Sequence, residues 1–259
     1  MSNFNPKYKL YYQGEWDESL FAKCMTIVGS RRMTDYGRRV IEKIVPQLVQ
    51  AGWTIVSGFM YGVDRAVHEA TLACGGRTIA VLGWGVNWQK LDDRELKLEE
   101  EIVNSGGLLV SLWEEQVPTL WTFPARDRVM AAIGHELIVI EAGVKSGSLI
   151  TAEMAYKLKK PIWAVPGPIT SSVSLGTNQL IADGKAKIYQ YHPLGPPLKL
   201  RGGNPQEGEI LDLISDQGLD VSEIARRLGR PASDIGSELT MLMLRGDVEE
   251  REGKYFVVK

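Results

Sequence analysis

Residues 25–57 read MTIVGSRRMTDYGRRVIEKIVPQLVQAGWTIVS: a short apolar run, a glycine turn, a longer amphipathic segment and a second short apolar run. In the middle segment, Thr34–Gln50, the apolar residues recur at helical spacing, at Val40, Ile41, Ile44, Val45, Leu48 and Val49. Gly52 stands where such a helix is expected to end. The flanking runs, Met25–Val28 and Thr54–Ser57, are nearly continuous in apolar character, which is typical of parallel strands covered on both faces. The stretch therefore predicts a β-α-β unit.

The same alternation of short apolar runs and longer amphipathic segments continues through the first 190 residues or so. Four more strands are predicted at Thr78–Leu82, Leu108–Ser111, Leu137–Ile140 and Ile162–Val165. Two more helices are predicted at Asp92–Asn104 and Leu149–Lys159. Strands that alternate with helices in this way predict an α/β fold, here an extended Rossmann-like, doubly wound and mostly parallel sheet. We assign it to residues 1–191, with a short N-terminal extension.

A second, smaller unit follows a segment rich in proline and glycine. Residues 192–206, HPLGPPLKLRGGNPQ, follow neither period and are predicted to be a linker. Residues 207–259 contain three helical segments and then two short extended runs around Gly253, the pattern of a winged helix. The third segment, Ser233–Arg245, offers Asp234 and Glu238 where a duplex reader presents basic or amide side chains. A protein-contact or structural role is therefore favoured over duplex reading.

Composition narrows the class of protein. The chain has 259 residues and a net charge of −2, but residues 206–259 carry 7 basic and 12 acidic residues, a net −5, which leaves +3 on the first 205. A polyanion would therefore bind the large domain. No apolar run approaches a membrane helix, and the N-terminus has no signal core, so we expect a cytoplasmic protein without membrane contact. Cys24 and Cys74 lack metal-ligand spacing and are expected to be a buried, reduced pair; we predict no metal and no cofactor.

The candidate binding residues lie in loops that follow predicted strands. In an open α/β sheet, ligands bind beyond the carboxyl ends of the strands, often at a helix N-terminus. Gly29, Ser30 and Arg31 follow the first predicted strand, and Lys145, Ser146, Gly147 and Ser148 follow the fifth. We expect these residues to meet phosphates at one edge of the sheet, although a plain surface arginine would look the same in the sequence.

A third group of candidates combines arginines with aromatic residues. The box FPARDR places Arg126 and Arg128 beside Phe123, the mixture of charge and flat surface that single-stranded nucleic acid requires. Phe59, Tyr61 and Phe123 are the candidate base-stacking residues; packing in the core or at the rim is the alternative for each. Asp64 and His68 share a helix face, but a structural pair is favoured over acid/base catalysis. No catalytic residue is predicted.

Six motifs, taken in order, resemble one family. They are VGSR (28–31), SGFMYGVDRAVH (57–68), GGRTIAVLGWG (75–85), FPARDR (123–128), IVIEAGVKSGSLITAEMA (138–155) and VPGPITSSVSLGTNQLI (165–181). They closely resemble the DNA-processing protein A family, also called DprA or Smf. The resemblance implies a homodimer that binds and protects single-stranded DNA without sequence preference and helps to load a RecA-type recombinase in natural transformation or recombination, with no catalytic step.

The resemblance assigns contact with the DNA backbone to Arg31, Arg126, Arg128 and Lys145. The chain departs from the family pattern at Asp127, because the box reads RDR where RNR is usual. An added carboxylate there is expected to weaken or reorient phosphate contact. SGFMYGVD also replaces the usual SGLA, a residue and GID.

Two other function classes stay open at this point. One is a phosphoribohydrolase-like enzyme, although EAGVKSGSLIT lacks that group's PGGxGT turn and catalytic glutamate. The other is a Rossmann-like sensor of small nucleotides. Neither a P-loop nor a dinucleotide fingerprint is present, since Gly83-Trp84-Gly85 lacks the third glycine.

Overall fold

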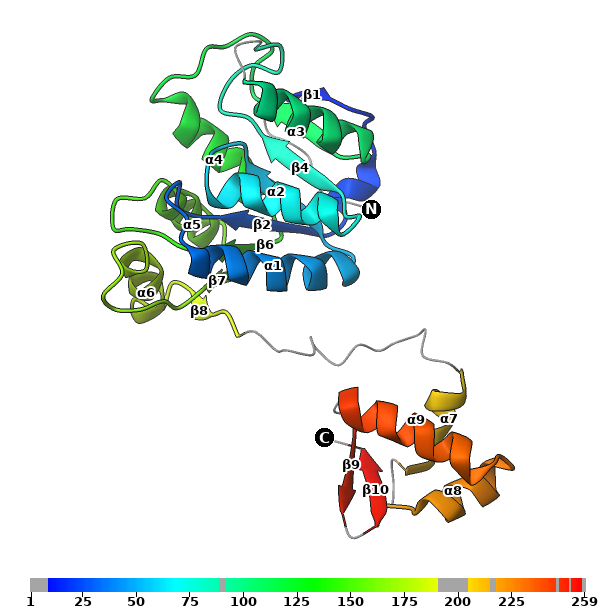
Figure 1. The fold of residues 1–259 in the computed structure, drawn as a ribbon. Helices are drawn as coiled ribbons and strands as arrows, with labels where there is room; N and C mark the ends of the chain where they lie inside the picture. Colours follow the sequence, from blue (N-terminus) through cyan, green and yellow to red (C-terminus); the bar gives the residue numbers. More distant parts are fainter. Residues whose placement is uncertain are drawn as a thin grey trace. The chain divides into compact units, whose positions relative to one another are not determined.

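The computed structural model describes residues 9–88, 92–190, 205–214, 218–245, 247–251 and 253–257. The chain divides into two compact units, Met1–Tyr191 and His192–Lys259 (Figure 1). Each unit has its own apolar core. Most of the predicted linker, residues 192–206, lies outside the described residues.

The large unit is built on an eight-stranded sheet in the order β1-β5-β4-β3-β2-β6-β7-β8. The strands are β1 (Tyr11–Gln13), β2 (Cys24–Val28), β3 (Thr54–Gly58), β4 (Thr78–Val81), β5 (Leu108–Ser111), β6 (Glu136–Val139), β7 (Ile162–Ala164) and β8 (Lys187–Ile188). All pairings are parallel except that of β1 with β5. The chain winds from β2 to β5 in one direction and then continues from β6 to β8 in the other. The strand order therefore reverses between β2 and β6.

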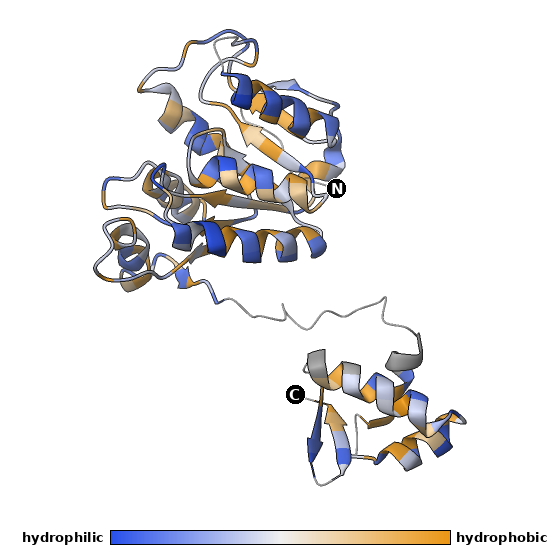
Figure 2. Cartoon of the chain, in the orientation of Figure 1, coloured by the Kyte–Doolittle hydropathy of each residue, from blue (hydrophilic) through white to orange (hydrophobic). Residues whose placement is uncertain are grey.

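Helices cover both faces of this sheet. They are α1 (Asp35–Gln50), α2 (Val63–Ala73), α3 (Asp93–Asn104), α4 (Thr122–Ile133), α5 (Ser148–Lys157) and α6 (Leu175–Ala182), after a short 3-10 helix, η1 (Glu18–Phe21). Figure 1 shows α1, α2 and α3 on the same face. Successive β2 residues divide between the two cores: Met25 and Ile27 pack with α1 and α2, while Cys24 and Val28 pack with α4 and α5. Orange segments mark the central strands of this sheet in Figure 2, because both faces of those strands are covered.

The sequence-based fold prediction is confirmed for the class and for the six predicted strands, whose limits are correct to within one residue at each end. The edge strands β1 and β8 were not predicted, because three and two residues are too short to show a period. The sequence predicted no element for the box FPARDR, and its residues form the first turns of α4. This difference decides which side chains reach solvent.

The small unit consists of α7 (Pro205–Ile214), α8 (Val221–Leu228) and α9 (Ala232–Arg245), followed by the antiparallel hairpin of β9 (Val248–Arg251) and β10 (Lys254–Val257). Gly229, in the left-handed conformation, ends α8, and Asp220 caps its start. Ile224, Ile235 and Leu239 are among the side chains that fill the core. Three helices and a two-stranded wing confirm the winged-helix prediction.

Cys24 and Cys74 are both free, but only Cys24 is buried; the expectation that both are buried was wrong, because Cys74 lies at the exposed C-cap of α2. Among the described residues, no helix has the length and apolar character needed to cross a membrane.

Candidate nucleic-acid interface

The candidate interface lies where the strand order reverses, beyond the carboxyl ends of β2 and β6. Loops from both strands meet here, as is general for ligand crevices in open α/β sheets. The β2 loop contributes Arg31 and the β6 loop contributes Lys145, and both side chains are exposed. The sequence predicted that these two loops share one edge of the sheet. The structure brings them there because β2 and β6 are parallel neighbours.

Gly29 and Ser30 shape the turn that carries Arg31. A Cβ atom on Gly29 would lie 2.6 Å from Val63 Cγ2, so only glycine lets the turn pack on α2. The hydroxyl oxygen of Ser30 accepts a hydrogen bond from the backbone N–H of Arg32 at 3.0 Å, and Ser30 is buried. Both residues therefore position the turn. The exposed guanidinium of Arg31 is the group on this turn that can bind an anion.

Arg31 rests on an aromatic ring from α4. Its guanidinium carbon lies 5.4 Å from the centroid of the Phe123 ring, a cation–π arrangement. A Cβ atom on Gly83 would lie 2.7 Å from Cδ1 of the same ring. The Phe123 ring therefore lies between the β4 loop and Arg31, where it supports the cation and has little free face for a base.

Arg126 is not in the place that was expected for a phosphate-binding residue. It is 4% exposed, and its Nη1 donates to the carbonyl of Val81 at 3.2 Å. Its Nε lies 3.1 Å from Asp127 Oδ1 in ion-pair rather than hydrogen-bond geometry, and its Nη1 lies 3.8 Å from Asp64 Oδ2. The guanidinium thus joins α4 to β4 and α2 beneath the interface. Arg126 is therefore not part of the exposed contact surface.

The different positions of Arg126 and Arg128 follow from the helix. Residues two apart on an α-helix point about 200° from each other, whereas two apart on a strand they share a face. Arg126 therefore points inward and Arg128 is exposed. Asp127 is also buried. Burial raises the pKa of Asp127, while Arg126 and Arg31 act in the opposite direction, so Asp127 is an electrostatic neighbour of Arg31.

The N-terminus of α1, a common anion site in this kind of fold, is already filled. Glu141, the second residue after β6, is 2% exposed. Its Oε2 accepts from the backbone N–H of Thr34 at 2.9 Å, and its Oε1 accepts from the Thr34 hydroxyl at 2.5 Å. A Cβ atom on Gly37 would lie 2.6 Å from Glu141 Oε2. The chain's own carboxylate thus occupies the place where a nucleotide phosphate would bind.

Sequence reasoning missed this role of Glu141. The signal was present in part, since a lone acidic residue ends an otherwise apolar strand run, IVIE. The hydrogen bonds to Thr34 show that the carboxylate faces the start of α1, and the pairing of β6 with β2 brings it there.

The loop between β6 and α5 keeps its cation free. Lys145 and Gly147 are exposed, and nothing lies within 4 Å of a Cβ atom placed on Gly147. The hydroxyls of Ser146 and Ser148 are 2.7 Å apart, and Ser148 is buried. No side chain caps the start of α5. Gly176, at the start of α6, donates its N–H to the Ala142 carbonyl at 2.7 Å and so holds this loop in place.

Of the three candidate stacking residues, Tyr61 is the best placed. Phe59 is 5% exposed and packs near Trp84 and His68, so it belongs to the core. Tyr61 is 53% exposed, and the guanidinium carbon of Arg65 lies 5.3 Å from its ring centroid. One face of the Tyr61 ring is therefore held by a cation. Arg65, which sequence reasoning also missed, is half-buried and lies 3.7 Å from Glu95 of α3, so it supports the Tyr61 ring and adds little free charge to the surface.

Asp64 and His68 form part of the structural layer under the interface. Burial raises the pKa of Asp64 to about 6 and lowers that of His68 to about 4. The His68 ring nitrogens lie 2.7 Å from the Gly58 carbonyl and 2.8 Å from the Thr78 hydroxyl. Both nitrogens are occupied inside the protein, so the ring is not free to accept a proton from a substrate.

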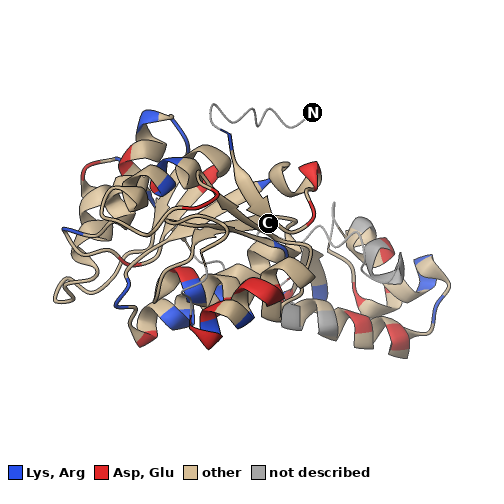
Figure 3. Ribbon diagram, turned by 90° about the horizontal axis from the view of Figure 1, so that it is seen from above, with Lys and Arg blue, Asp and Glu red and all other residues tan. Residues whose placement is uncertain are grey.

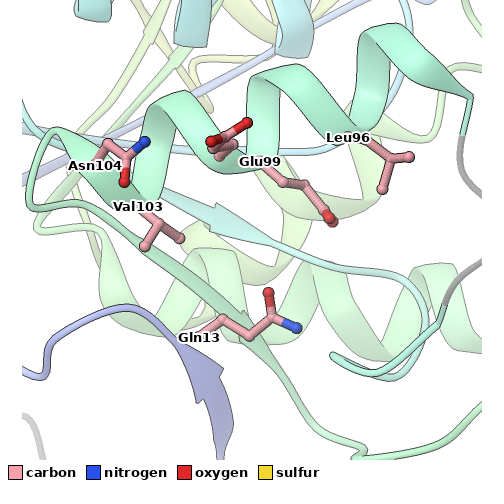
Figure 4. A pocket seen from close by; sticks show the side chains of 6 residues that line it. Gln13, Leu96, Glu99, Val103 and Asn104 are labelled. Atoms are coloured by element: carbon pink, nitrogen blue, oxygen red, sulfur yellow. The ribbon is translucent and has the colours of Figure 1, made fainter.

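A pocket away from the candidate interface does not suit a small phosphorylated ligand. A pocket of about 280 Å³ lies between β1 and α3 (Figure 4). It is lined by Gln13, Leu96, Glu99, Glu100, Val103 and Asn104. Burial, with a contribution from Glu95, raises the pKa of Glu99 to about 7. Its lining has two carboxyl groups and no cation, so it would repel a phosphate. No group of three or more His, Cys, Asp or Glu among the described residues could hold a metal.

Positive charge is concentrated in one part of the sequence of the large unit. In Figure 3, basic and acidic residues are mixed over the ribbon. Within residues 31–43, however, five basic residues face two acidic ones, a net +3 that equals the excess of the first 205 residues.

An open, doubly wound sheet with exposed cations at its switch point, joined to a winged helix, defines a two-domain Rossmann-like protein. Residues 3–193 match the model of the family DNA recombination-mediator protein A, and residues 195–254 match the DprA winged helix domain. The chain belongs to this family.

Relatives of known name agree. Protein Smf of Escherichia coli K12 is 31% identical over 265 residues, covering 95% of this chain and 70% of Smf. DNA processing protein DprA of Streptococcus pneumoniae is 37% identical over 177 residues, covering 68% of this chain and 61% of that protein. A crystal structure of the pneumococcal protein matches 71% of this chain and 67% of that chain, with a TM-score of 0.62 and 33% identity. A structure of DNA processing protein A from Helicobacter pylori matches 69% of this chain and 80% of that chain, with a TM-score of 0.61 and 31% identity. That structure concerns the single-stranded DNA binding mode of the Helicobacter pylori protein.

Proposed function

We propose that this protein binds single-stranded DNA without sequence preference at the carboxyl edge of its sheet, protects the strand, and helps to load a RecA-type recombinase during transformation or recombination. In this proposal Arg31, Arg128 and Lys145 contact phosphates, and the backbone of Ser146 and Gly147 adds N–H donors. Tyr61 stacks on a base. Phe123 holds Arg31 in position.

The observation that carries the proposal is the arrangement at the switch point. The helix start that would suit a nucleotide phosphate is filled by Glu141, while the guanidinium of Arg31 is exposed on its aromatic support. Anion binding is thereby left to separate, exposed cations along an open edge. A polymer with regularly spaced phosphates and flat bases fits such an edge better than a compact nucleotide does.

Homodimerisation and recombinase contact are proposed from family membership. Two adjoining edges would lengthen the cationic surface and raise the effective concentration of the second site for one strand. Sedimentation of the protein with and without oligo-dT tests the dimer. RecA-type filament growth on strands coated with a single-strand-binding protein, with and without this protein, tests loading.

The strand-binding proposal is tested by fluorescence anisotropy of labelled oligo-dT across a salt series, with duplex DNA and a mononucleotide as competitors. Wild type is expected to bind the single strand and to lose affinity as salt rises. In a plot of the logarithm of the binding constant against the logarithm of the salt concentration, each phosphate contact contributes about −0.7 to the slope. Arg31→Ala/Lys145→Ala is expected to bind weakly. Absence of binding by wild type at low salt, or displacement by the mononucleotide but not by unlabelled oligo-dT, would refute the proposal.

A further inference from the structure

The first turns of α1 carry a second group of exposed arginines beside the interface. Arg32 lies on the β2–α1 turn, and Arg38 and Arg39 lie in the first two turns of the helix. All three are exposed, and within the described part of the chain none of them lies within 4 Å of a carboxylate in a salt bridge. Unpaired arginines this close together repel one another, so an anionic partner would stabilise the patch.

The position of this patch is fixed by the residues that build the interface. Arg38 donates its backbone N–H to the Thr34 carbonyl at 3.0 Å, so it stands one turn beyond the residue that Glu141 binds. With a rise of about 1.5 Å per residue, Arg38 and Arg39 lie about 6 to 8 Å along the axis from Thr34. The buried face of α1 contains Gly37 and Ile41, which places Arg39 on the opposite, outer side.

Glu141 also affects which groups can bind an anion near the start of α1. Its carboxyl group binds the backbone N–H and the hydroxyl of Thr34, the N-cap residue of α1, so a phosphate at this helix start would meet a buried acidic group. The exposed arginine side chains are therefore the more favourable contact for an anion near this helix. Two exposed carboxylates, Asp35 and Glu42, lie on the same helix and are outnumbered by the basic side chains.

We propose that Arg32, Arg38 and Arg39 form an exit track, along which single-stranded DNA leaves the interface over the outer surface of α1. The inference rests on the proposed function and adds to it the path that the strand follows beyond the interface. Because the track lies beyond the switch-point cations, only strands longer than the interface reach it.

The test compares Arg38→Gln/Arg39→Gln with wild type on oligo-dT of increasing length. Glutamine keeps most of the side-chain length and helix propensity while it removes the charge. Two lost phosphate contacts on a single strand lower the salt slope by about 1.4, which at 0.1 M salt corresponds to about 25-fold weaker binding of long strands. The shortest strands that wild type binds are expected to show no change.

A matched control removes two exposed cations elsewhere on the same unit. Lys97→Gln/Lys157→Gln makes the same change in net charge on α3 and α5, where each lysine is paired with a glutamate four residues on or back. It is expected to bind all lengths within about twofold of wild type. A similar loss in this control would show that net charge, and not a track, carries the effect, and would overturn the inference.

Failure of the track is distinct from failure of the proposed function. If Arg31→Ala/Lys145→Ala loses binding while Arg38→Gln/Arg39→Gln binds every length as wild type does, the function stands and the track is refuted. An equal loss at every length would place Arg38 and Arg39 in the interface itself and would also refute the track. If wild type binds no strand, the proposed function fails first.

Discussion

Replacing Asp64 by asparagine should change how the stability of the large unit depends on pH. Asp64 is fully buried beside Arg126, and burial raises its pKa from 3.8 to about 6. The folded state therefore holds a proton between pH 4 and 6 that the unfolded state has released. This contribution to stability is fully present below pH 3.8 and is lost as the pH rises through 6. At 1.36 kcal/mol per pH unit it is worth about 3 kcal/mol.

His68 works in the opposite direction over the same range. Burial lowers its pKa from 6.5 to about 4, so its contribution is present above pH 6.5 and is lost as the pH falls through 4. It is also worth about 3 kcal/mol. The two effects oppose each other in wild type, which hides both of them, and a single substitution exposes one.

The assay is urea unfolding at pH 7 and pH 4, followed by tryptophan fluorescence. All seven tryptophans lie in the first 191 residues, so the signal reports the large unit alone. Relative to wild type, Asp64→Asn is expected to lose about 2.5 kcal/mol of unfolding free energy on going from pH 7 to pH 4, because the unfolded-state carboxyl is only partly protonated at pH 4. His68→Gln is expected to gain about 3 kcal/mol over the same range. An Asp64→Asn difference that is the same at both pH values would refute the reasoning, because it would mean that Arg126 keeps Asp64 ionised throughout.

Three further predictions concern the layer under the interface and its surface. Gly58→Ala places a Cβ atom 1.6 Å from Arg126 Nη1 and displaces that guanidinium from its carboxylates, so urea unfolding at pH 7 should show a loss of about 3 to 5 kcal/mol; a loss below about 1 kcal/mol would contradict it. Asp127→Asn removes the carboxylate that partly neutralises Arg31, so anisotropy at 0.1 M salt should show up to about fivefold tighter binding of oligo-dT, and unchanged or weaker binding would count against it. Tyr61→Ala should cost about 1 to 3 kcal/mol of binding free energy in the same assay while Tyr61→Phe retains affinity; equal losses in both would exclude stacking.

The sequence predicted the elements of the sheet well, because the information lies within each short segment. Apolar runs such as Leu137–Ile140 and the helical period of Thr34–Gln50 are local patterns. Their order along the chain also placed Arg31 and Lys145 in loops at the carboxyl ends of strands. The short strands β1 and β8 escaped prediction, because their pairing partners, and not their own residues, define them.

The sequence did not decide which of the candidate side chains would be free to bind. FPARDR has the same letters in a loop as in a helix, and only the helix turns Arg126 inward and leaves Arg128 outside. Phe59 was indistinguishable from Tyr61 until the packing of β4 and α3 buried one ring and left the other exposed.

By itself, then, the sequence determined the α/β class, the winged-helix unit and the edge of the sheet where a ligand would lie. Only the tertiary structure decided that Glu141 fills the start of α1, that Asp64 and Asp127 hold Arg126 inside, and that Arg31, Arg128 and Lys145 remain exposed. The physical reason is that burial and charge pairing depend on contacts between segments far apart in the chain. A local pattern encodes the shape of each segment, but the partner that reaches a given side chain is set by how the segments pack.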